Sequence, residues 1–305
     1  MTGASPAIHT QDLAKRYGKT VALRALTMTV ERGEVFGFLG PNGAGKTTAV
    51  KLLLGLARPT GGEAWILGAP LGDLATRRRI GYLPELFRYQ PWMRAREVLR
   101  LHCALARLER ATWGAEIGDV LTTVGLADRA ADRVGTFSKG MQQRLGLAVA
   151  LLGTPDLVLL DEPTSALDPV GRRDVREIIA GLKARGVTVF LNSHLLTEVE
   201  RVCDRVAIVD KGAVVAEGRV DDIGAGAGVR VQVTDLAEAD GAALSRFGPV
   251  EIAGDWLRVR GLTDGAVPDL VAEIVRRGGR VHAVHPERAT LEERFLSLLG
   301  EEKPS

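Results

Sequence analysis

Short apolar runs alternate with helical patterns along the chain as far as about residue 220. The run at residues 35–39 is followed by a glycine-rich stretch and then by a helix-like segment at residues 49–56. Further runs at residues 157–160 and 187–191 have the length of buried strands, and a helical pattern at residues 171–185 lies between them. Strands that alternate with helices in this way predict an α/β fold built on a parallel sheet.

The pattern around this core predicts two additions. Residues 94–152 change to helical periods, with Val98, Leu101 and Leu105 on one face, so we expect a helical subdomain at about residues 88–152. It ends at Ser138, a natural N-cap for a helix running to residue 152. Short strands at residues 7–13, 21–30 and 63–67 predict an antiparallel β subdomain, and strands at residues 206–209 and 214–217 predict a closing hairpin around Lys211 and Gly212.

A linker separates these elements from a second unit. Glycines alternate with alanines at residues 224–228, and the chain then restarts, which predicts one domain at residues 1–223 and another at residues 229–305. Strands at residues 229–233, 250–252, 256–260 and 281–284, with helices at residues 240–247 and 267–277, give the βαββαβ order of a ferredoxin-like domain. A last helix at residues 290–299 has one apolar face, so it should dock on this sheet or on a partner.

Composition and charge argue against several classes of protein. The 305 residues carry a formal charge of only +2, and the basic residues are scattered among acidic ones, which argues against a nucleic-acid-binding protein. Cys103 and Cys203 are too far apart, and too isolated from other ligands, to suggest a disulfide framework or a zinc site, and a reducing cytosol fits. Because no targeting segment and no run of membrane-spanning length is found, any membrane role must involve a partner.

The glycine-rich stretch has the spacing of a P-loop. Glycines allow successive backbone N–H groups to curl around phosphate oxygens, and the following helix adds its positive N-terminal end. Lys46 would reach the β- and γ-phosphates, and the Thr47 hydroxyl would ligate Mg²⁺. The alternative is a glycine-rich turn that binds nothing. The predicted phosphate-binding residues are Gly40, Pro41, Asn42, Gly43, Ala44, Gly45, Lys46, Thr47 and Thr48.

Two neighbouring strands should deliver polar side chains to the same edge of the sheet. The run at residues 157–160 ends in Asp161 and Glu162, and the run at residues 187–191 is followed by His194. Asp161 would hold Mg²⁺, and Glu162 would act as the general base that polarises the attacking water. His194 would contact the γ-phosphate. The sequence therefore predicts an ATPase site.

The order of the motifs resembles that of the nucleotide-binding subunits of ATP-binding cassette (ABC) transporters, over about residues 7–220. The resemblance rests on the P-loop, Asp161, Glu162 and His194, together with two further motifs, Ser138-Lys139-Gly140-Met141-Gln142 and Ser165-Ala166-Leu167-Asp168. The reading SKGMQ in place of the commoner SGGQ, and a C-terminal domain ending in LEERFLSLL, resemble exporter-type subunits whose membrane domain is a separate polypeptide.

The resemblance implies how ATP is bound. Tyr17, which by itself is as compatible with hairpin packing, would stack on adenine. Ser138 and Gly140, with Lys139, Met141 and Gln142 around them, would bind ATP held by the opposite protomer, and Asp168 would reach across the dimer seam. ATP and Mg²⁺ would thus be clasped by a dimer, either of two copies or of one copy with a related subunit, on the cytoplasmic face of a membrane.

One position departs from the family's pattern. The loop after the strand at residue 80 usually carries a glutamine that contacts Mg²⁺, and this chain has Glu85 there. The aromatic residues that follow, Phe87, Tyr89 and Trp92, lie where the family docks a helix of the membrane subunit. We expect them to line that groove, with core packing as the alternative.

Two rival functions remain open at this point. A soluble ABC ATPase of DNA repair or translation would usually carry a long coiled coil or a second cassette, and neither pattern is present. A regulatory subunit that binds ATP without turnover would not need Glu162 and His194. The exported substrate cannot be read from this chain because in this family the membrane subunit selects it.

Overall fold

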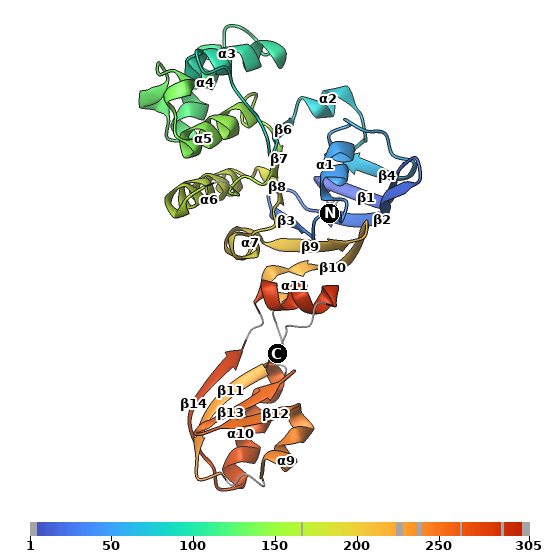
Figure 1. Ribbon diagram of the computed structural model, residues 1–305, viewed down its shortest axis with the longest axis vertical. Coiled ribbons are helices and arrows are strands. Elements are labelled where there is room, and N and C mark those ends of the chain that lie inside the picture. Colours follow the sequence, from blue (N-terminus) through green and yellow to red (C-terminus); the bar gives the residue numbers. More distant parts are fainter. Residues whose placement is uncertain are drawn as a thin grey trace. The chain divides into compact units, whose positions relative to one another are not determined.

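The computed structural model divides into two compact units, Met1–Gly218 and Arg219–Ser305. It describes residues 5–165, 167–223, 228–236, 240–262, 264–287 and 290–300. Of the predicted linker at residues 224–228, only Gly228 is described. Ala166, in the motif at residues 165–168, lies outside the described residues. Each unit has its own β-sheet (Figure 1).

The first unit is built on a ten-stranded sheet in the order β5-β4-β1-β2-β10-β9-β3-β8-β7-β6. Strands β9, β3, β8, β7 and β6 pair parallel with one another, whereas β1 pairs antiparallel with β2 and β4. The α/β core with an antiparallel β subdomain is as predicted. The strands are β1 Ile8–Tyr17, β2 Thr20–Val30, β3 Val35–Leu39, β4 Gly61–Ile66, β5 Ala69–Pro70, β6 Ile80–Leu83, β7 Leu157–Asp161, β8 Thr188–Asn192, β9 Arg205–Asp210 and β10 Ala213–Arg219.

Buried side chains fix the centre of this sheet. Every residue of β3, β7 and β8 is buried, as expected for parallel strands covered on both faces. The rings of Phe38 and Phe190 lie 5.2 Å apart between neighbouring strands. The predicted turn between β9 and β10 is present: Lys211 and Gly212 both have positive φ, which suits a two-residue hairpin turn.

Helices α3, α4 and α5 form the predicted helical subdomain, which extends from the end of the sheet beyond β6 (Figure 1). Helix α1 begins at Lys46, three residues earlier than predicted, so Lys46 and Thr47 lie in its first turn. Helix α7, after His194, was not predicted. The helices are α1 Lys46–Leu53, α2 Leu74–Arg77, α3 Ala95–Leu105, α4 Trp113–Thr123, α5 Lys139–Ala150, α6 Pro169–Ala184 and α7 Leu196–Val202, with 3₁₀ turns at Ala127–Arg129 and Val134–Thr136.

The second unit contains a four-stranded antiparallel sheet in the order β12-β13-β11-β14, with α9 and α10 in the predicted βαββαβ sequence. Alternate residues such as Val229 and Val231 point into a core shared with Leu270 and Ile274 of α10. Helix α11 contacts the short helix α8. The elements are α8 Val220–Ile223, β11 Gly228–Thr234, α9 Asp240–Leu244, β12 Val250–Ala253, β13 Trp256–Arg260, α10 Val267–Arg276, β14 Arg280–Glu287 and α11 Leu291–Leu299, with 3₁₀ turns at Ser245–Phe247 and Asp264–Ala266.

Candidate active site

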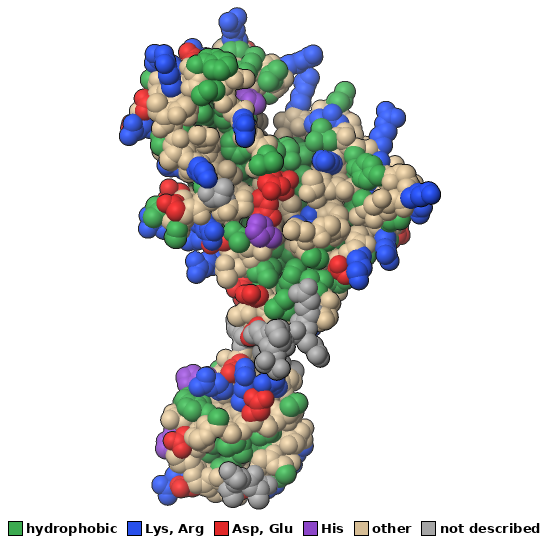
Figure 2. Space-filling view, in the orientation of Figure 1, with side chains coloured by type: hydrophobic (Ala, Val, Ile, Leu, Met, Phe, Trp, Pro, Cys, Tyr) green, Lys and Arg blue, Asp and Glu red, His purple; other side chains and the backbone are tan. Residues whose placement is uncertain are grey.

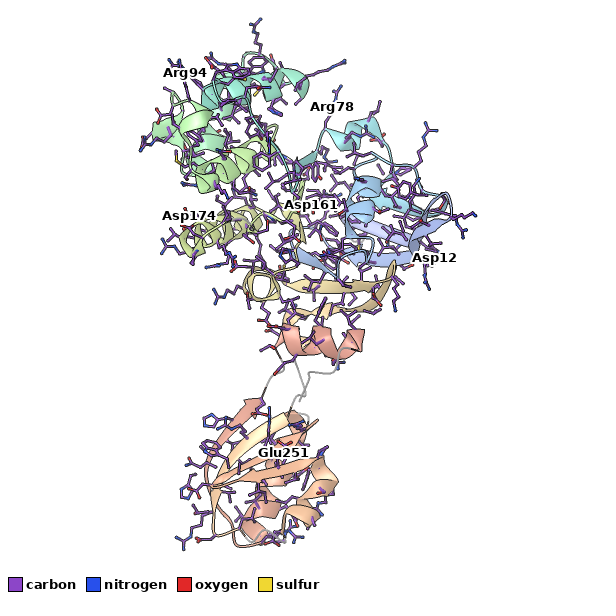
Figure 3. The ribbon with its side chains drawn as sticks, in the orientation of Figure 1. Asp12, Arg78, Arg94, Asp161, Asp174 and Glu251 are labelled. Atoms are coloured by element: carbon purple, nitrogen blue, oxygen red, sulfur yellow. The ribbon has the colours of Figure 1, made fainter. Side chains whose placement is uncertain are left out.

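Strand register brings the predicted site residues to one edge of the first sheet. Asn192 at the end of β8 pairs with Phe38 of β3 on one side and with Asp161 of β7 on the other. Leu83 at the end of β6 pairs with Leu160. The residues that follow these strand ends therefore emerge at the same level, and Figure 3 places Asp161 there, at the centre of the unit.

The P-loop connects β3 to α1, and two of its glycines are required by space. A Cβ at Gly40 would lie 2.3 Å from the carbonyl oxygen of Val209, and one at Gly45, where φ is 102°, would lie 2.4 Å from that of Ala22. Gly43 differs, because it has a positive φ but no atom within 4 Å of its would-be Cβ. The loop is thus packed tightly at both ends and open at its middle, where a phosphate could approach the backbone.

Lys46 lies inside this loop. Its Nζ donates to the carbonyl oxygens of Gly40 at 2.6 Å and Pro41 at 3.2 Å. Burial lowers the pKa of Lys46, and the negative charges of Glu162, Asp161 and Glu85 oppose that shift. Three carboxylates are therefore close enough to act on one lysine. Thr47, the next residue, is exposed.

Asp161 is buried and is oriented by a residue that the sequence did not identify. The side-chain amide of Asn192 donates to Oδ1 of Asp161 at 2.5 Å, while the Oδ1 atom of Asn192 is buried without a hydrogen-bond partner. Burial raises the pKa of Asp161, although the Asn192 bond opposes this, and the charge of Glu85 raises it further. The only sequence signal for Asn192 was a polar residue at the end of an apolar run.

Glu162 has a strained backbone and an unsatisfied carboxylate. Its φ is 51°, in the left-handed region that a glutamate rarely adopts, and its backbone N–H donates to Asn192 O at 2.9 Å. The side chain is 9% exposed, and its Oε2 lies 2.7 Å from Nδ1 of His194. The two groups are not aligned as a hydrogen bond, so Oε2 is buried without one. Backbone strain and a buried carboxylate oxygen without a hydrogen bond are together typical of functional positions.

The motif at residues 138–142 lies at a helix N-terminus, as predicted. Ser138 caps α5, and its Oγ accepts from the backbone N–H of Met141 at 3.2 Å. Gln142 donates to Phe137 O at 3.1 Å, and a Cβ at Gly140 would lie 3.9 Å from Oγ of Ser138, an ordinary contact distance. Lys139 is exposed. Within this one chain these residues are held by their own helix, and none of these bonds reaches the P-loop.

Asp168 and Tyr17 are also placed by local interactions. Oδ1 of Asp168 accepts from the backbone N–H of Gly171 at 2.8 Å and so caps α6. Tyr17 ends β1 with its ring 48% exposed, and the Lys15 ammonium lies 4.8 Å from the ring centroid. The ring is therefore partly available for stacking.

The aromatic residues after β6 divide into packed and exposed ones. Phe87 packs against α5 at Gly146, where a Cβ would come within 2.7 Å of the ring. Tyr89 lies between Phe87 and His102, at ring distances of 5.3 and 5.9 Å, and burial raises its pKa. Trp92 is 67% exposed, and the neighbouring Leu86 is 86% exposed. Of the three aromatic rings expected to line a partner groove, only Trp92 is largely free at the surface.

The donor set at the edge suits a hard cation. Oxygen atoms of Thr47, Asp161 and Glu85 are the ligand type that Mg²⁺ prefers, and Mg²⁺ commonly takes one or two carboxylates plus substrate phosphates. Within the described ranges, no three His, Cys, Asp or Glu side chains gather closely enough to form a protein-only metal site. The residues therefore fit a metal that is bound together with a phosphate ligand.

These features define a P-loop ATPase. The family model described as ABC transporter matches residues 23–165. An ABC transporter ATP-binding protein of Nostoc sp., described as uncharacterized, is 39% identical, covering 98% of this chain and 91% of its own length. A fluoroquinolones export ATP-binding protein of Mycobacterium tuberculosis is 37% identical, covering 96% and 93%. A dimeric ATP-binding cassette bound to ADP and Pi, in a post-hydrolysis state, aligns with a TM-score of 0.62 and 25% identity, covering 70% of this chain and 98% of the other.

The chain belongs to the ATP-binding proteins of ABC transporters. It is an ATP-binding and ATP-hydrolysing subunit of this transporter family.

Proposed function

We propose that two copies of this chain clasp ATP between them, hydrolyse it at the edge formed by β3, β6, β7 and β8, and so drive export through a separate membrane subunit. The observation that carries the proposal is the common register of the strand ends, which groups Asp161, Glu162 and His194 beside the P-loop. Parallel strands deliver their C-terminal residues to one edge, which is where this class of fold binds nucleotides.

Binding would use the P-loop and α1. Phosphate oxygens would replace the carbonyl oxygens of Gly40 and Pro41 as acceptors for Lys46, which already lies within reach of the loop. The backbone N–H groups at residues 42–48 and the N-terminus of α1 would bind the remaining phosphate oxygens. The half-exposed ring of Tyr17 would stack on adenine.

Thr47, Asp161 and Glu85 would hold Mg²⁺, whose charge would neutralise the β- and γ-phosphate oxygens. The Asn192 amide keeps the Asp161 carboxylate in one orientation through its 2.5 Å bond, which is the type of support that metal ligands receive from their neighbours.

Glu162 would act as the base for hydrolysis. Water would attack the γ-phosphorus in line with the leaving oxygen, and its proton would pass to Oε2 of Glu162, which accepts no hydrogen bond in the structure. His194, 54% exposed and 2.7 Å from that oxygen, would hold the γ-phosphate side of the site. Lys46 and the loop amides would stabilise the charge on the transferred group.

The second half of each site would come from another protomer. The capped N-terminus of α5, with exposed Ser138, half-buried Gly140 and Lys139, Met141 and Gln142 beside them, offers an anion-binding end. Asp168 would reach across the same seam. The dimeric state of a solved relative supports this arrangement. ATP would then act as a reversible link, because its cleavage removes the shared γ-phosphate.

Export would require a partner in the membrane. No helix among the described residues combines the length and hydropathy needed to cross a bilayer, and a relative covering most of this chain is named for export. The chain would act at the cytoplasmic face of the membrane, with exposed Leu86 and Trp92 as the surface that receives an apolar helix of the membrane subunit.

Replacing the base tests the proposal. Glu162→Gln should bind ATP but not cleave it, so gel filtration with ATP and Mg²⁺ should show a stable dimer, and ADP should not produce one. Lys46→Ala, which weakens phosphate binding, is the control and should remain monomeric. A Glu162→Gln protein that binds ATP as a monomer would exclude the clasped dimer.

The partner surface has its own test. Trp92→Ala should abolish transport in membranes that contain the whole complex while the basal ATPase rate of the isolated chain is kept. Leu74→Ala, at an equally exposed leucine on α2, should leave transport unchanged. Loss of folding in Trp92→Ala would instead mean that the ring is a packing residue.

A further inference from the structure

A groove between α3 and α4 has a charge pattern that ATP hydrolysis does not explain. Its volume is about 620 Å³, and its lining includes Arg96, Arg100, Arg110, Trp113, Gly114 and Gly118. Arg94, labelled in Figure 3, marks the start of α3, and Figure 2 shows Lys and Arg side chains around the outer rim of this helical part. The lining includes no residue of the P-loop, of β7 or of the α5 N-terminus.

The positive charges that line the groove are not neutralised by carboxylates in its lining. All three arginines are exposed, the lining contains no carboxylate, and within the described residues none of the three guanidinium groups forms an ion pair. Arg96 and Arg100 are one helical turn apart, where like charges destabilise a helix. Two acids adjoin these arginines in sequence, Glu97 beside Arg96 and Glu109 beside Arg110, and neither lines the groove. Oε2 of Glu97 accepts from the backbone N–H of Arg94 at 2.8 Å.

The opposite face of α4 does not share this excess of positive charge. The groove there, of about 590 Å³, is lined by Glu116, Asp119 and Asp156 together with Arg185. Acidic and basic groups thus occur together on one side of the helix, and only basic groups line the other. An arrangement of uncompensated arginines around a concavity is the one that binds anionic oxygens well, because guanidinium groups donate in pairs to phosphate.

The groove is also lined by an aromatic ring and by two glycines that leave the backbone of α4 accessible. Trp113 is fixed by a hydrogen bond from its Nε1 to Leu108 O at 3.2 Å, and the Arg110 guanidinium lies 5.8 Å from its ring centroid. Gly114 and Gly118 follow one turn apart on α4, and neither has an atom within 4 Å of its would-be Cβ. Apolar atoms of a ligand could therefore contact the helix backbone beside the indole ring.

We propose that this groove binds a phosphoryl group carried by a small organic molecule, with Arg96, Arg100 and Arg110 on the phosphate and the organic part against Trp113 and the glycines. The volume suits a small ligand or a lipid headgroup and is within the usual range for such sites. The phosphoryl group could belong to a soluble phosphate ester or to an anionic phospholipid, and the two sources share this chemistry.

The test measures binding with the nucleotide site already filled. With saturating ADP and Mg²⁺, phenyl phosphate should bind the full-length protein by isothermal titration calorimetry and quench tryptophan fluorescence. The triple variant Arg96→Gln, Arg100→Gln, Arg110→Gln should bind it at least about tenfold more weakly, since each charged hydrogen-bonding partner commonly contributes that much. Trp113→Phe should abolish the quench. The matched control is Arg58→Gln, Arg78→Gln, Arg201→Gln, at exposed arginines outside the groove.

Vesicles distinguish the two sources. Sedimentation with phosphatidylcholine vesicles, with and without phosphatidylglycerol, should show binding that requires the anionic lipid and the groove arginines if the ligand is a headgroup. Binding of phenyl phosphate alone would assign the groove to a soluble ester. The proposal fails if the wild-type protein binds neither probe, or if the control triple variant loses as much binding as the groove variant. ATPase activity and melting temperature of each variant check that it is folded.

Discussion

Two buried glutamates, one in each unit, show how differently the same side chain can be held. Glu162 follows β7 with a left-handed backbone and an Oε2 atom that accepts no hydrogen bond. Glu273 on α10 is 4% exposed and accepts from Arg277 at 2.8 Å, from Arg246 at 2.9 Å and from Arg276. The first carboxylate is left available for chemistry, whereas the second is saturated with partners.

The pKa of a carboxylate is shifted in opposite directions in the two units. The hydrogen bond from Arg277, with the charges of the three arginines, lowers the pKa of Glu273, so its ionised form favours the folded state. Beside Glu162, burial raises the pKa of Asp161, so ionised Asp161 opposes folding until a cation is bound. The sheet edge is therefore built for ligand binding at a cost in stability, and the second unit uses its carboxylate for stability.

Exchanging each glutamate for glutamine should separate the two roles, and the largest effect is expected at the sheet edge. Glu162→Gln should lower the ATP turnover number by a factor of roughly 10²–10⁴, the usual contribution of a general base. Its thermal unfolding should change little, because glutamine is close to glutamate in size and the neighbour of Oε2, His194 at 2.7 Å, is 54% exposed, where ion pairs contribute little. The measurement is steady-state phosphate release alongside calorimetric melting, with Glu273→Gln as the control. Turnover within twofold of wild type would remove Glu162 from the reaction.

The reverse result is expected in the second unit. Glu273→Gln should lower the melting temperature of that unit while turnover is kept, because the three arginines lose their shared negative partner. The folded pKa is below the ordinary value of 4.5, so this stabilisation is complete above pH 4.5 and is lost as the pH falls through the lowered value. Hydrogen exchange of the β11 and β13 amides follows the unit directly.

The pH dependence decides how Glu273 acts. The difference between the wild-type protein and Glu273→Gln should be largest near neutral pH and should shrink in acid. A difference that stays constant down to pH values below 4.5 would mean that the glutamate acts through packing and not through its charge.

Strands and helices of both units could be predicted from the sequence, but the contacts that hold the two glutamates could not. The apolar runs predicted β3, β7 and β8 because every residue in them is buried, and Ser138 predicted the start of α5 through its capping side chain. The βαββαβ order followed from strand and helix periods in the same way. These are local properties, decided by neighbours in the sequence.

Contacts between distant segments were not predictable. The Asn192–Asp161 bond depends on the register of β7 against β8, and the Glu273 cluster joins α9, α10 and the turn after α9. Phe87 and Tyr89 were expected to face a partner, yet they pack inward because Gly146 leaves room on α5 for a ring. No pattern within either segment alone contains that information.

A third glutamate, Glu85, acts on the ATPase site without being buried in it. Its replacement should have a smaller effect on turnover than that of Glu162. It is exposed, yet its charge raises the pKa of Asp161 and that of Lys46, so it acts on the site through space. Glu85→Gln should raise the Mg²⁺ concentration for half-maximal turnover, by less than about fivefold, since exposed charges contribute at most about 1 kcal/mol. Glu109→Gln, at an exposed glutamate of the helical part, is the matched control. An unchanged Mg²⁺ titration would mean that the carboxylate does not contact the metal, and that only Asp161 and Thr47 do.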